Sequence, residues 1–316
     1  MATAKPTTQP TAHPTTVLDA LSAAAAGSLA VAGPSIVRIG RAPGRGCGIV
    51  VADGRVLTNA HNLRDRTTEV TFADGRAVQA VVAGVDPDGD LVVLDVDTVD
   101  APVLAWAEDV PGPGQVVFAV ARAADGSDRV TFGMVSGRER SFRGPRGRRI
   151  TGSLEHTAPL PRGSSGSPVV DGAGRLVGLN TARLPDGFYL ALPADAALRG
   201  RVDALVRGES VTRLALGVGL APADVARQLR ASVGLPDQPG LLVRTVAPSS
   251  AAEAAGLRVG DLITGAGDRP VAALDDLHAA LDDARSSRVL ALHVVRGAEE
   301  LDLEVSFASA PPESEG

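Results

Sequence analysis

The sequence predicts a mainly β protein of two domains, a larger β-rich domain at residues 17–207 and a smaller α/β domain at residues 210–308. Over residues 36–193, short runs of Val, Ile and Leu alternate with Gly, Asp and Pro, which is the pattern of many short strands joined by tight turns. One such turn is the Ala-Asp-Gly sequence at 52–54, which is typical of a hairpin. The length of 316 residues also suits about two domains.

The segments around these strands have signatures of their own. Residues 1–16 are rich in Pro and Thr and predict a disordered tail, and residues 309–316 form an acidic tail. Helices are expected at residues 16–26, where the helix is amphipathic, and at residues 195–207, where the helix closes the first domain. Residues 137–152 contain six arginines together with glycines and a proline, so we expect a loop there.

The second domain alternates strand and helix patterns. Strands are expected at 214–220, 241–246, 262–263, 289–296 and 301–307, and helices at 223–232, 251–255 and 274–284. Such a mixture of five short strands and three helices predicts a small, independent α/β module.

The composition is that of an ordinary soluble globular protein, with 44% apolar and 22% charged residues. A formal net charge of −6 argues against a general nucleic-acid-binding protein. The stretch at 18–32 reads as too short and too weakly apolar to span a bilayer, and the N-terminus lacks a signal-peptide pattern. We therefore expect a cytoplasmic protein without a membrane span.

Cys47 is the only cysteine, which excludes an intrachain disulfide and permits a reducing compartment. A thiol packed in the core is the simpler interpretation of this residue, and a redox switch is the alternative.

Three short segments carry the side chains of a nucleophilic hydrolase. His61 ends Leu-Thr-Asn-Ala-His, Asp90 precedes the apolar run at 91–94, and Ser165 lies in Gly-Ser-Ser-Gly-Ser-Pro. A serine hydroxyl needs an imidazole to take its proton and a buried carboxylate to orient that imidazole. The chain order His, Asp, Ser is that of the chymotrypsin-type double β-barrel, so we expect this fold for the larger domain.

Asp86 and Asp88 compete with Asp90 for the role of the orienting carboxylate. Their Asp-x-Asp-x-Asp spacing also begins a calcium-binding loop, but that loop needs Gly at position six and Glu at position twelve. This chain has Leu91 and Asp97 there, so no metal is expected, and no cofactor either. We expect Asp86 and Asp88 to be turn residues and Asp90 to be buried at the start of a strand.

The turn around Ser165 is flanked by Gly163 and Gly166, which let the backbone fold tightly. The N–H groups of Gly163 and Ser165 are expected to form an oxyanion hole. Taken alone, this segment would read as a surface loop. Together with His61 and Asp90, it indicates the nucleophile.

Residues 17–308 resemble the HtrA/Deg family, in which a trypsin-like protease domain precedes a PDZ domain. The matching protease motifs include Gly-Cys-Gly-Ile-Val at 46–50, Thr-Asn-Ala-His at 58–61, Phe-Gly-Met-Val-Ser-Gly at 132–137 and Gly-Leu-Asn-Thr at 178–181. The matching PDZ motifs include Leu-Gly-Val at 216–218 and Ala-Gly-Leu-Arg-Val-Gly-Asp-Leu-Ile at 255–263. The resemblance implies that Leu216, Gly217 and Val218 bind peptide C-termini. It also implies a homo-oligomer, commonly a trimer, although residues 17–35 lack the aromatic residues that assemble such trimers.

The same comparison predicts the specificity pocket. In trypsins, the acid that selects Arg and Lys lies six residues before the nucleophile, where this chain has Pro159. With Leu160 as a neighbouring wall residue, the pocket is expected to take small or medium apolar side chains.

These features predict an ATP-independent serine endopeptidase of protein quality control, which cleaves unfolded proteins while its PDZ domain binds substrate or regulatory peptides. The alternative is a catalytically silent PDZ scaffold or holdase with a collapsed oxyanion hole. That alternative rests on Ser164 and Ser167, which stand where the family usually has Asn and Gly, and on Arg162, since Pro-Arg at 161–162 replaces the usual Asn-Pro pair.

Overall fold

The computed structural model describes residues 16–41, 45–123, 125–144, 149–211, 214–221 and 223–307. The tails expected at 1–16 and 309–316 lie outside these residues, except for Thr16. The chain divides into two compact units between Val211 and Thr212, and each is described by itself.

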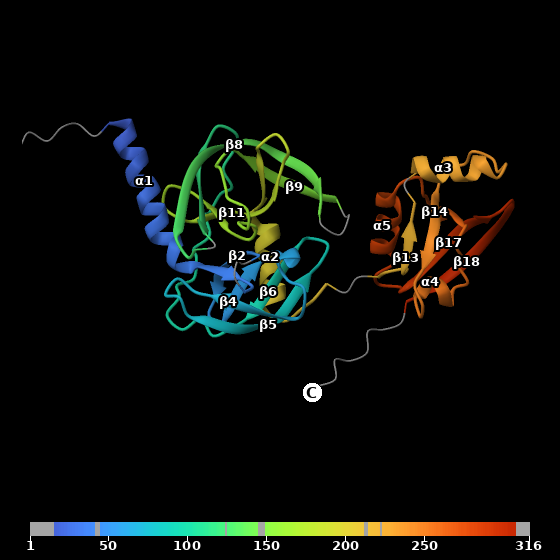
Figure 1. Cartoon of the computed structure of the whole chain (residues 1–316), viewed down its shortest axis with the longest axis horizontal. Coiled ribbons are helices and arrows are strands. Elements are labelled where there is room, and N and C mark those ends of the chain that lie inside the picture. The colour runs from blue at the N-terminus through green and yellow to red at the C-terminus, as the bar shows by residue number, and fades with distance from the viewer. Residues whose placement is uncertain are drawn as a thin grey trace, which may run out of the picture. The chain divides into compact units, whose positions relative to one another are not determined.

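The first unit contains two closed six-stranded barrels, as predicted, shown in blue-cyan and green-yellow in Figure 1. The strands of the first barrel are β1 (Ile36–Ile39), β2 (Gly46–Ala52), β3 (Arg55–Thr58), β4 (Thr67–Thr71), β5 (Ala77–Asp86) and β6 (Leu91–Asp95), in the order β1-β2-β3-β6-β5-β4. Those of the second are β7 (Val116–Arg122), β8 (Asp128–Arg143), β9 (Arg149–His156), β10 (Pro168–Val170), β11 (Leu176–Arg183) and β12 (Tyr189–Pro193), in the order β10-β11-β12-β9-β8-β7. Neighbouring strands are antiparallel.

The loop expected at 137–152 is wrong for most of its length. β8 continues to Arg143 and β9 begins at Arg149, and the two strands pair Phe142 with Ile150 across the hairpin. Arg140 lies on this ribbon, and its guanidinium forms an ion pair with Glu155 at 2.8 Å. Cross-strand packing and charge pairing thus stabilise a β-ribbon where composition alone indicates a loop.

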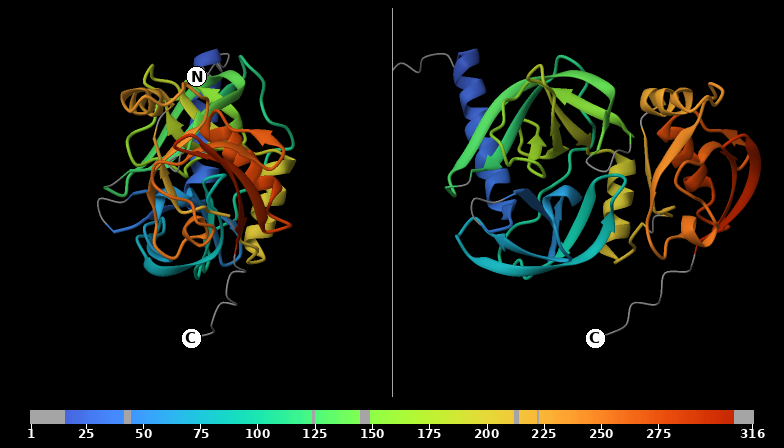
Figure 2. Two further views of the ribbon diagram at one scale, coloured as in Figure 1. Left: turned by 90° about the vertical axis from the view of Figure 1, so that its right-hand side faces the viewer. Right: turned by 45° about the vertical axis from the view of Figure 1, so that its right-hand side comes forward.

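Helix α1 (Val17–Ala32) is longer than the expected 16–26. It begins with a capping box, in which Thr16 Oγ1 accepts from the Asp19 N–H and the Asp19 carboxylate accepts from the Thr16 N–H. It packs against β7, β8 and β10, and Ser28 and Ala32 are fully buried there (Figures 1 and 2). Because tertiary packing supplies most helix stability, the helix continues past Gly27.

With the 3₁₀ turn η1 (Gly33–Ser35), α1 gives a helical segment of 19 residues, Val17–Ser35, in which a stretch of 18 residues has a mean hydropathy of 1.4 and 17% of its residues buried. In the described part of the chain, it is the one helix whose length and composition suffice to cross a membrane. The expectation that this segment is too short and too weakly apolar is therefore wrong. Signal sequences and core helices of soluble proteins meet the same criteria.

Helix α2 (Ala196–Val206) closes the first unit, as expected for 195–207, and Asp195 caps it by accepting from the Leu198 N–H at 2.8 Å. It lies against β5 and β6. The contact is close because Gly84 of β5 has no side chain: a Cβ there would lie 2.5 Å from the Leu205 carbonyl oxygen.

The second unit is a small α/β domain. Its strands are β13 (Val218–Leu220), β14 (Leu241–Val246), β15 (Leu262–Ala266), β16 (Arg269–Pro270), β17 (Val289–Arg296) and β18 (Glu299–Ser306), and its helices are α3 (Ala223–Ser232), α4 (Ala251–Ala254) and α5 (Leu274–Asp283). The strand order is β13-β14-β15-β17-β18, with β16 paired to β15. The strand expected at 214–220 is confined to its last three residues, since the segment before Val218 runs as a loop.

Replacing Gly84 with Ala should destabilise the first unit by about 1–3 kcal/mol, because the new methyl group must push α2 away from β5. Gly200→Ala on the same helix is the matched control, since no atom lies within 4 Å of a Cβ there. That control should stabilise the protein by about 0.5–1 kcal/mol. Denaturant unfolding of both variants measures the difference, and equal stability of the two would contradict the close contact.

Candidate active site

Asp90 lies at the end of the turn between β5 and β6 in a left-handed conformation, with φ 56°. Its backbone is held in this unusual state because its carbonyl oxygen accepts from the Ala60 N–H and the Asn59 side-chain amide, each at 3.1 Å. The residue is only 3% exposed. The two hydrogen bonds bring the carboxylate to the short 3₁₀ helix η2 (Ala60–Asn62), which carries His61.

The Asp90 carboxylate orients the imidazole of His61 through two contacts. His61 Nδ1 lies 2.7 Å from Asp90 Oδ2, and the His61 N–H donates to Asp90 Oδ1 at 3.0 Å. Because an ionised carboxylate only accepts, Nδ1 carries the proton and Nε2 has a free lone pair. A third group, the Thr181 hydroxyl from β11, donates to Asp90 Oδ2 at 2.9 Å.

Asp88 lies in the turn, as expected, whereas Asp86 is the last residue of β5 and anchors the turn from there. Asp86 accepts from the Gly89 N–H at 3.0 Å, and its Oδ2 accepts from Arg201 Nε of α2 at 3.0 Å. Asp86 therefore binds α2 to the first barrel, and it is Asp90 that contacts His61. In the described residues, no cluster of three or more His, Cys, Asp or Glu is arranged to hold a metal ion.

The turn that carries Ser165 is fixed by the first barrel. The Ser165 carbonyl oxygen accepts from the Cys47 N–H at 2.8 Å and from the Asn62 side-chain amide at 2.9 Å. Gly166 has φ +84°, and a Cβ at this position would lie 2.1 Å from the Cys47 carbonyl oxygen. The sequence of the turn thus requires glycine both for its dihedral angle and for its close approach to β2.

Ser165 Oγ donates to the Thr181 carbonyl oxygen at 3.4 Å, and no hydrogen bond to His61 is formed within the described residues. Gly163 has φ +82°. Within the same residues, the N–H groups of Gly163 and Ser165 donate to no other protein group. The two donors predicted to form the oxyanion hole are therefore not occupied by a described carbonyl oxygen.

A small cavity of about 160 Å³ lies beside Ser165. Its lining includes Leu160, Tyr189 and Arg183 and contains no carboxylate among the described residues. Tyr189 donates its hydroxyl proton to the Leu160 carbonyl oxygen at 3.1 Å and so fixes the wall. Leu160 is thus one of the residues that line the cavity next to Ser165.

Pro159, however, is not part of this lining, and the expectation for this residue needs correction. It is exposed, and its carbonyl oxygen accepts from Thr131 Oγ1 at 2.7 Å. The physical reason is that this bond to β8 holds Pro159 away from the cavity.

A buried hydrogen-bond network behind the Ser165 turn was not predicted from the sequence. The Asn180 carbonyl oxygen accepts from the Gly166 N–H at 2.7 Å, and Asn180 Nδ2 donates to Ser167 Oγ at 3.1 Å. Asn180 Oδ1 then accepts from His156 Nε2 at 2.8 Å, and the His156 ring stacks on Tyr189. The sequence signal for this network was the presence of two polar residues, His156 and Asn180, within otherwise apolar strands.

Cys47 is fully buried in β2. Burial raises the pKa of its thiol, while the Arg122 carbonyl oxygen contacts Sγ at 3.6 Å. Because the thiolate is the reactive form, the position supports the packed core thiol.

The second unit has a groove of about 610 Å³ between β13 and α5, and Leu216, Gly217 and Val218 all line it. Gly217 has φ +78°, and a Cβ there would lie 2.4 Å from Ser250 Cβ. The carbonyl oxygens of Leu216 and Gly217 accept from Ala252 and Ala247, which turns the loop into the groove.

Comparison with known proteins agrees with both units. Residues 46–179 match the trypsin-like peptidase domain family, and residues 215–307 match the PDZ domain family. The chain is 31% identical over 293 residues to Protease Do-like 1, chloroplastic, of Arabidopsis thaliana, which covers 86% of this chain and 65% of that relative. It is 28% identical over 278 residues to Serine endoprotease DegS of Escherichia coli (strain K12), covering 84% and 77%. The chain thus spans slightly less than two thirds of the Arabidopsis protein.

Solved structures show the same fold. The HtrA-type protease AlgW with decapeptide has a TM-score of 0.63 at 23% identity, covering 91% of this chain and 99% of that one. A serine endoprotease from Yersinia pestis has a TM-score of 0.60 at 25% identity, covering 89% and 96%.

A trypsin-like peptidase domain followed by one PDZ domain is therefore the architecture of this chain. Within that class, its relatives identify it as a homologue of the HtrA/Deg proteases, as the sequence motifs predicted.

The expectation of a cytoplasmic location is not supported. It rested on the apparent lack of an N-terminal signal, whereas α1 is long and apolar enough for a signal sequence or an anchor. Relatives include a probable periplasmic serine endoprotease DegP-like of Chlamydia pneumoniae, at 30% identity with 85% of this chain and 56% of that protein covered.

The buried network predicts a loss of stability in acid. Burial lowers the pKa of His156, against a smaller opposing effect of its bond to Asn180. The unfolded chain, with an ordinary histidine pKa of 6.5, therefore binds this proton more readily than the folded chain. The stabilisation is complete above pH 6.5 and declines as the pH falls below it, by at most about 1.4 kcal/mol per pH unit for one proton.

Urea unfolding at several pH values measures this slope. His156→Gln keeps a donor for Asn180 without a titrating ring, so it should flatten the slope in this range. An unchanged slope in the variant would show that other groups cause the acid sensitivity.

Proposed function

We propose that this protein is an ATP-independent serine endopeptidase of protein quality control that cleaves unfolded chains. The observation that carries the proposal is the oriented His61–Asp90 pair next to the Ser165 turn. In this mechanism, His61 Nε2 takes the Ser165 proton as Oγ attacks the substrate carbonyl carbon, and Asp90 stabilises the imidazolium that forms. His61 then gives the proton to the leaving amine, and water completes the cycle without a nucleotide.

For the attack, the Ser165 side chain must turn from the Thr181 carbonyl oxygen towards His61. The bond it leaves is long, at 3.4 Å, so the turn has a low cost. The unoccupied N–H groups of Gly163 and Ser165 support an oxyanion hole that can accept charge, typically worth about 3–4 kcal/mol per donor. This geometry favours catalysis over the alternative of a silent scaffold.

An extended substrate suits this site, since unfolded chains can add as a β-strand to an exposed strand edge. In the PDZ domain, the free carboxylate of a peptide would bind at the Leu216-Gly217-Val218 loop while the peptide lies beside β13. AlgW, a structural neighbour, has been solved with a bound decapeptide.

Casein cleavage tests the proposal. Ser165→Ala and His61→Ala should each lower the rate by about four to six orders of magnitude, since the three residues act as a unit. Ser164→Ala is the matched control in the same turn, because among the described residues its hydroxyl donates to the Pro161 carbonyl oxygen alone, at 2.9 Å. It should keep most of the activity. A wild type without activity, or a Ser165→Ala variant that still cleaves, would sink the proposal.

Cleavage should follow Val, Ala or Leu rather than Arg or Lys. The cavity beside Ser165 is small, and its described lining includes Arg162 and Arg183 but no carboxylate. An unpaired cation in such a site costs roughly several kcal/mol. Mass spectrometry of casein digests identifies the cut sites. A majority of cuts after Arg or Lys would contradict this interpretation of the pocket.

Full-length Ser165→Ala should bind peptides with a hydrophobic C-terminus with a Kd of about tens of micromolar. Amidation of that C-terminus should remove most of the binding, since it deletes the charge that the backbone N–H groups recognise. Fluorescence anisotropy compares the two peptides. Equal affinity would mean that the groove recognises internal segments instead.

A further inference from the structure

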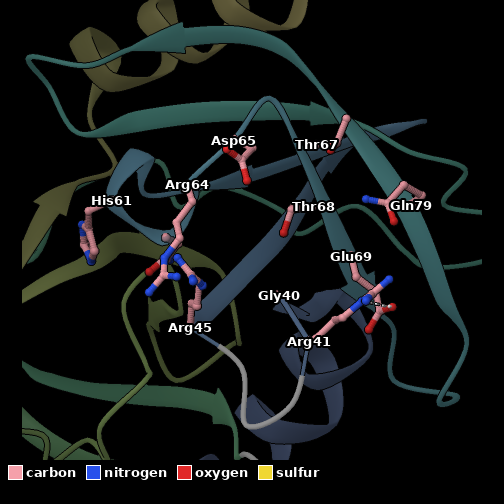
Figure 3. Close-up of a pocket in the computed structure, with 11 residues that line it drawn as sticks. Gly40, Arg41, Arg45, His61, Arg64, Asp65, Thr67, Thr68, Glu69 and Gln79 are labelled. Atoms are coloured by element: carbon pink, nitrogen blue, oxygen red, sulfur yellow. Dashed lines mark ion pairs between the residues drawn. The ribbon is translucent and has the colours of Figure 1, made fainter.

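A second, larger cavity of about 850 Å³ opens beside His61 in the first barrel (Figure 3). One wall comes from the ends of β1 and β2, with Gly40, Arg41 and Arg45. The other comes from η2, from the segment that leads into β4 and from β4 itself, with Arg64 and Glu69 among its residues. Neither the triad nor the pocket beside Ser165 accounts for this cavity.

The chemistry of the triad indicates which part of a substrate lies here. Ser165 opens onto the Leu160 cavity of the second barrel, which suits the side chain on the acyl side of the cleaved bond. His61 lines the other cavity, and its imidazole delivers a proton to the leaving amine. The chain that follows the cleaved bond must therefore leave past His61, towards the first-barrel cavity.

The cavity is rigid where it meets the triad. Gly46 at the start of β2 lies so close to η2 that a Cβ there would be 2.2 Å from Asn62 Nδ2. Asn62 also donates to the Ser165 carbonyl oxygen. The cavity and the nucleophile are thus held by the same side chain, so a subsite here keeps a fixed distance from the reacting atoms.

The cavity is lined by three arginines, at 41, 45 and 64, and by the carboxylates of Asp65 and Glu69. Arg45 and Arg64 are exposed and form no ion pair or side-chain hydrogen bond within the described residues. Figure 3 shows both on the side of the cavity where His61 lies. Glu69 is paired with Arg41 at 3.7 Å. Two guanidinium groups therefore remain available to a substrate.

We propose that this cavity is a subsite for the leaving-group half of the substrate, in which Arg45 and Arg64 select Asp or Glu. The selected residue lies within about three residues of the cleaved bond, since three extended residues span roughly 10 Å. The proposal rests on the proposed function. The preferred substrate then has an apolar residue before the cleaved bond and an acidic residue after it. Guanidinium groups suit this role because they bind carboxylates through paired N–H donors.

Paired fluorogenic peptides test the subsite. The two members of each pair share Val before the cut and differ only in Asp against Asn at the second or third residue after it. The wild type should show a kcat/KM ratio, Asp over Asn, of about two to five, the range expected for exposed charge pairs. Because both kcat/KM values of a ratio are measured on the same enzyme variant, a change in its overall activity does not alter the ratio. High salt should reduce the ratio, since it screens exposed charges.

The ratio should fall to about one in the Arg45→Gln/Arg64→Gln variant, because the selecting charges are gone. Arg129→Gln/Arg199→Gln is the matched control. It removes two exposed arginines that line neither cavity, and it should keep the wild-type ratio. A wild-type ratio near one, or a preference retained by the Arg45/Arg64 variant, would overturn the proposal.

A binding assay separates this proposal from the proposed function. Labelled peptides that represent the leaving half, with Asp or Asn, are titrated into Ser165→Ala at low salt. Preferential binding of the Asp peptide, lost in Ser165→Ala/Arg45→Gln/Arg64→Gln, supports the subsite even if the wild type cleaves no casein. Equal binding of both peptides overturns the subsite while casein cleavage leaves the proposed function intact.

Discussion

The active site depends on hydrogen bonds that cross from one barrel to the other. His61 and Asp90 belong to the first barrel and Ser165 to the second, so no single sheet positions all three. The crossing bonds run from Cys47 N–H and the Asn62 amide to the Ser165 carbonyl oxygen, and from Thr181 to Asp90. Buried bonds of this kind cost a full desolvation penalty when they are lost, which keeps the barrels in register.

Much of this arrangement could be predicted from the sequence because its residues are local markers. Gly163 and Gly166 indicate a tight turn, and Asp90 immediately precedes a run of apolar residues that has to be a buried strand. The double barrel then follows from the chain order of the three predicted catalytic residues. The partners of these residues are less visible, because Thr181 and Asn180 come from β11, far along the chain, and no local pattern shows that they contact Asp90 and the nucleophile turn.

The sequence predictions that proved wrong share one cause, which is packing between segments distant in the chain. The Gly137–Gly152 composition indicates a loop, but pairing of Phe142 with Ile150 favours strands. Gly27 suggests the end of a helix, but burial of Ser28 and Ala32 against the second barrel extends α1. Pro159 has the expected sequence spacing, but a bond from Thr131 holds it outside the pocket. In each case, a contact between distant segments outweighs the local preference.

The left-handed backbone at Asp90 restricts which residues can replace it. Among residues with a side chain, Asn and Asp adopt positive φ most readily, and both keep the oxygen that faces the His61 N–H. Asparagine is therefore the substitution that the fold accepts best at this position. It is also among the most harmful to catalysis, since a carboxamide can stabilise the wrong imidazole tautomer and carries no charge to balance an imidazolium. A homologue that has lost its protease activity through this residue would thus keep its fold, its stability and its peptide-binding domain unchanged.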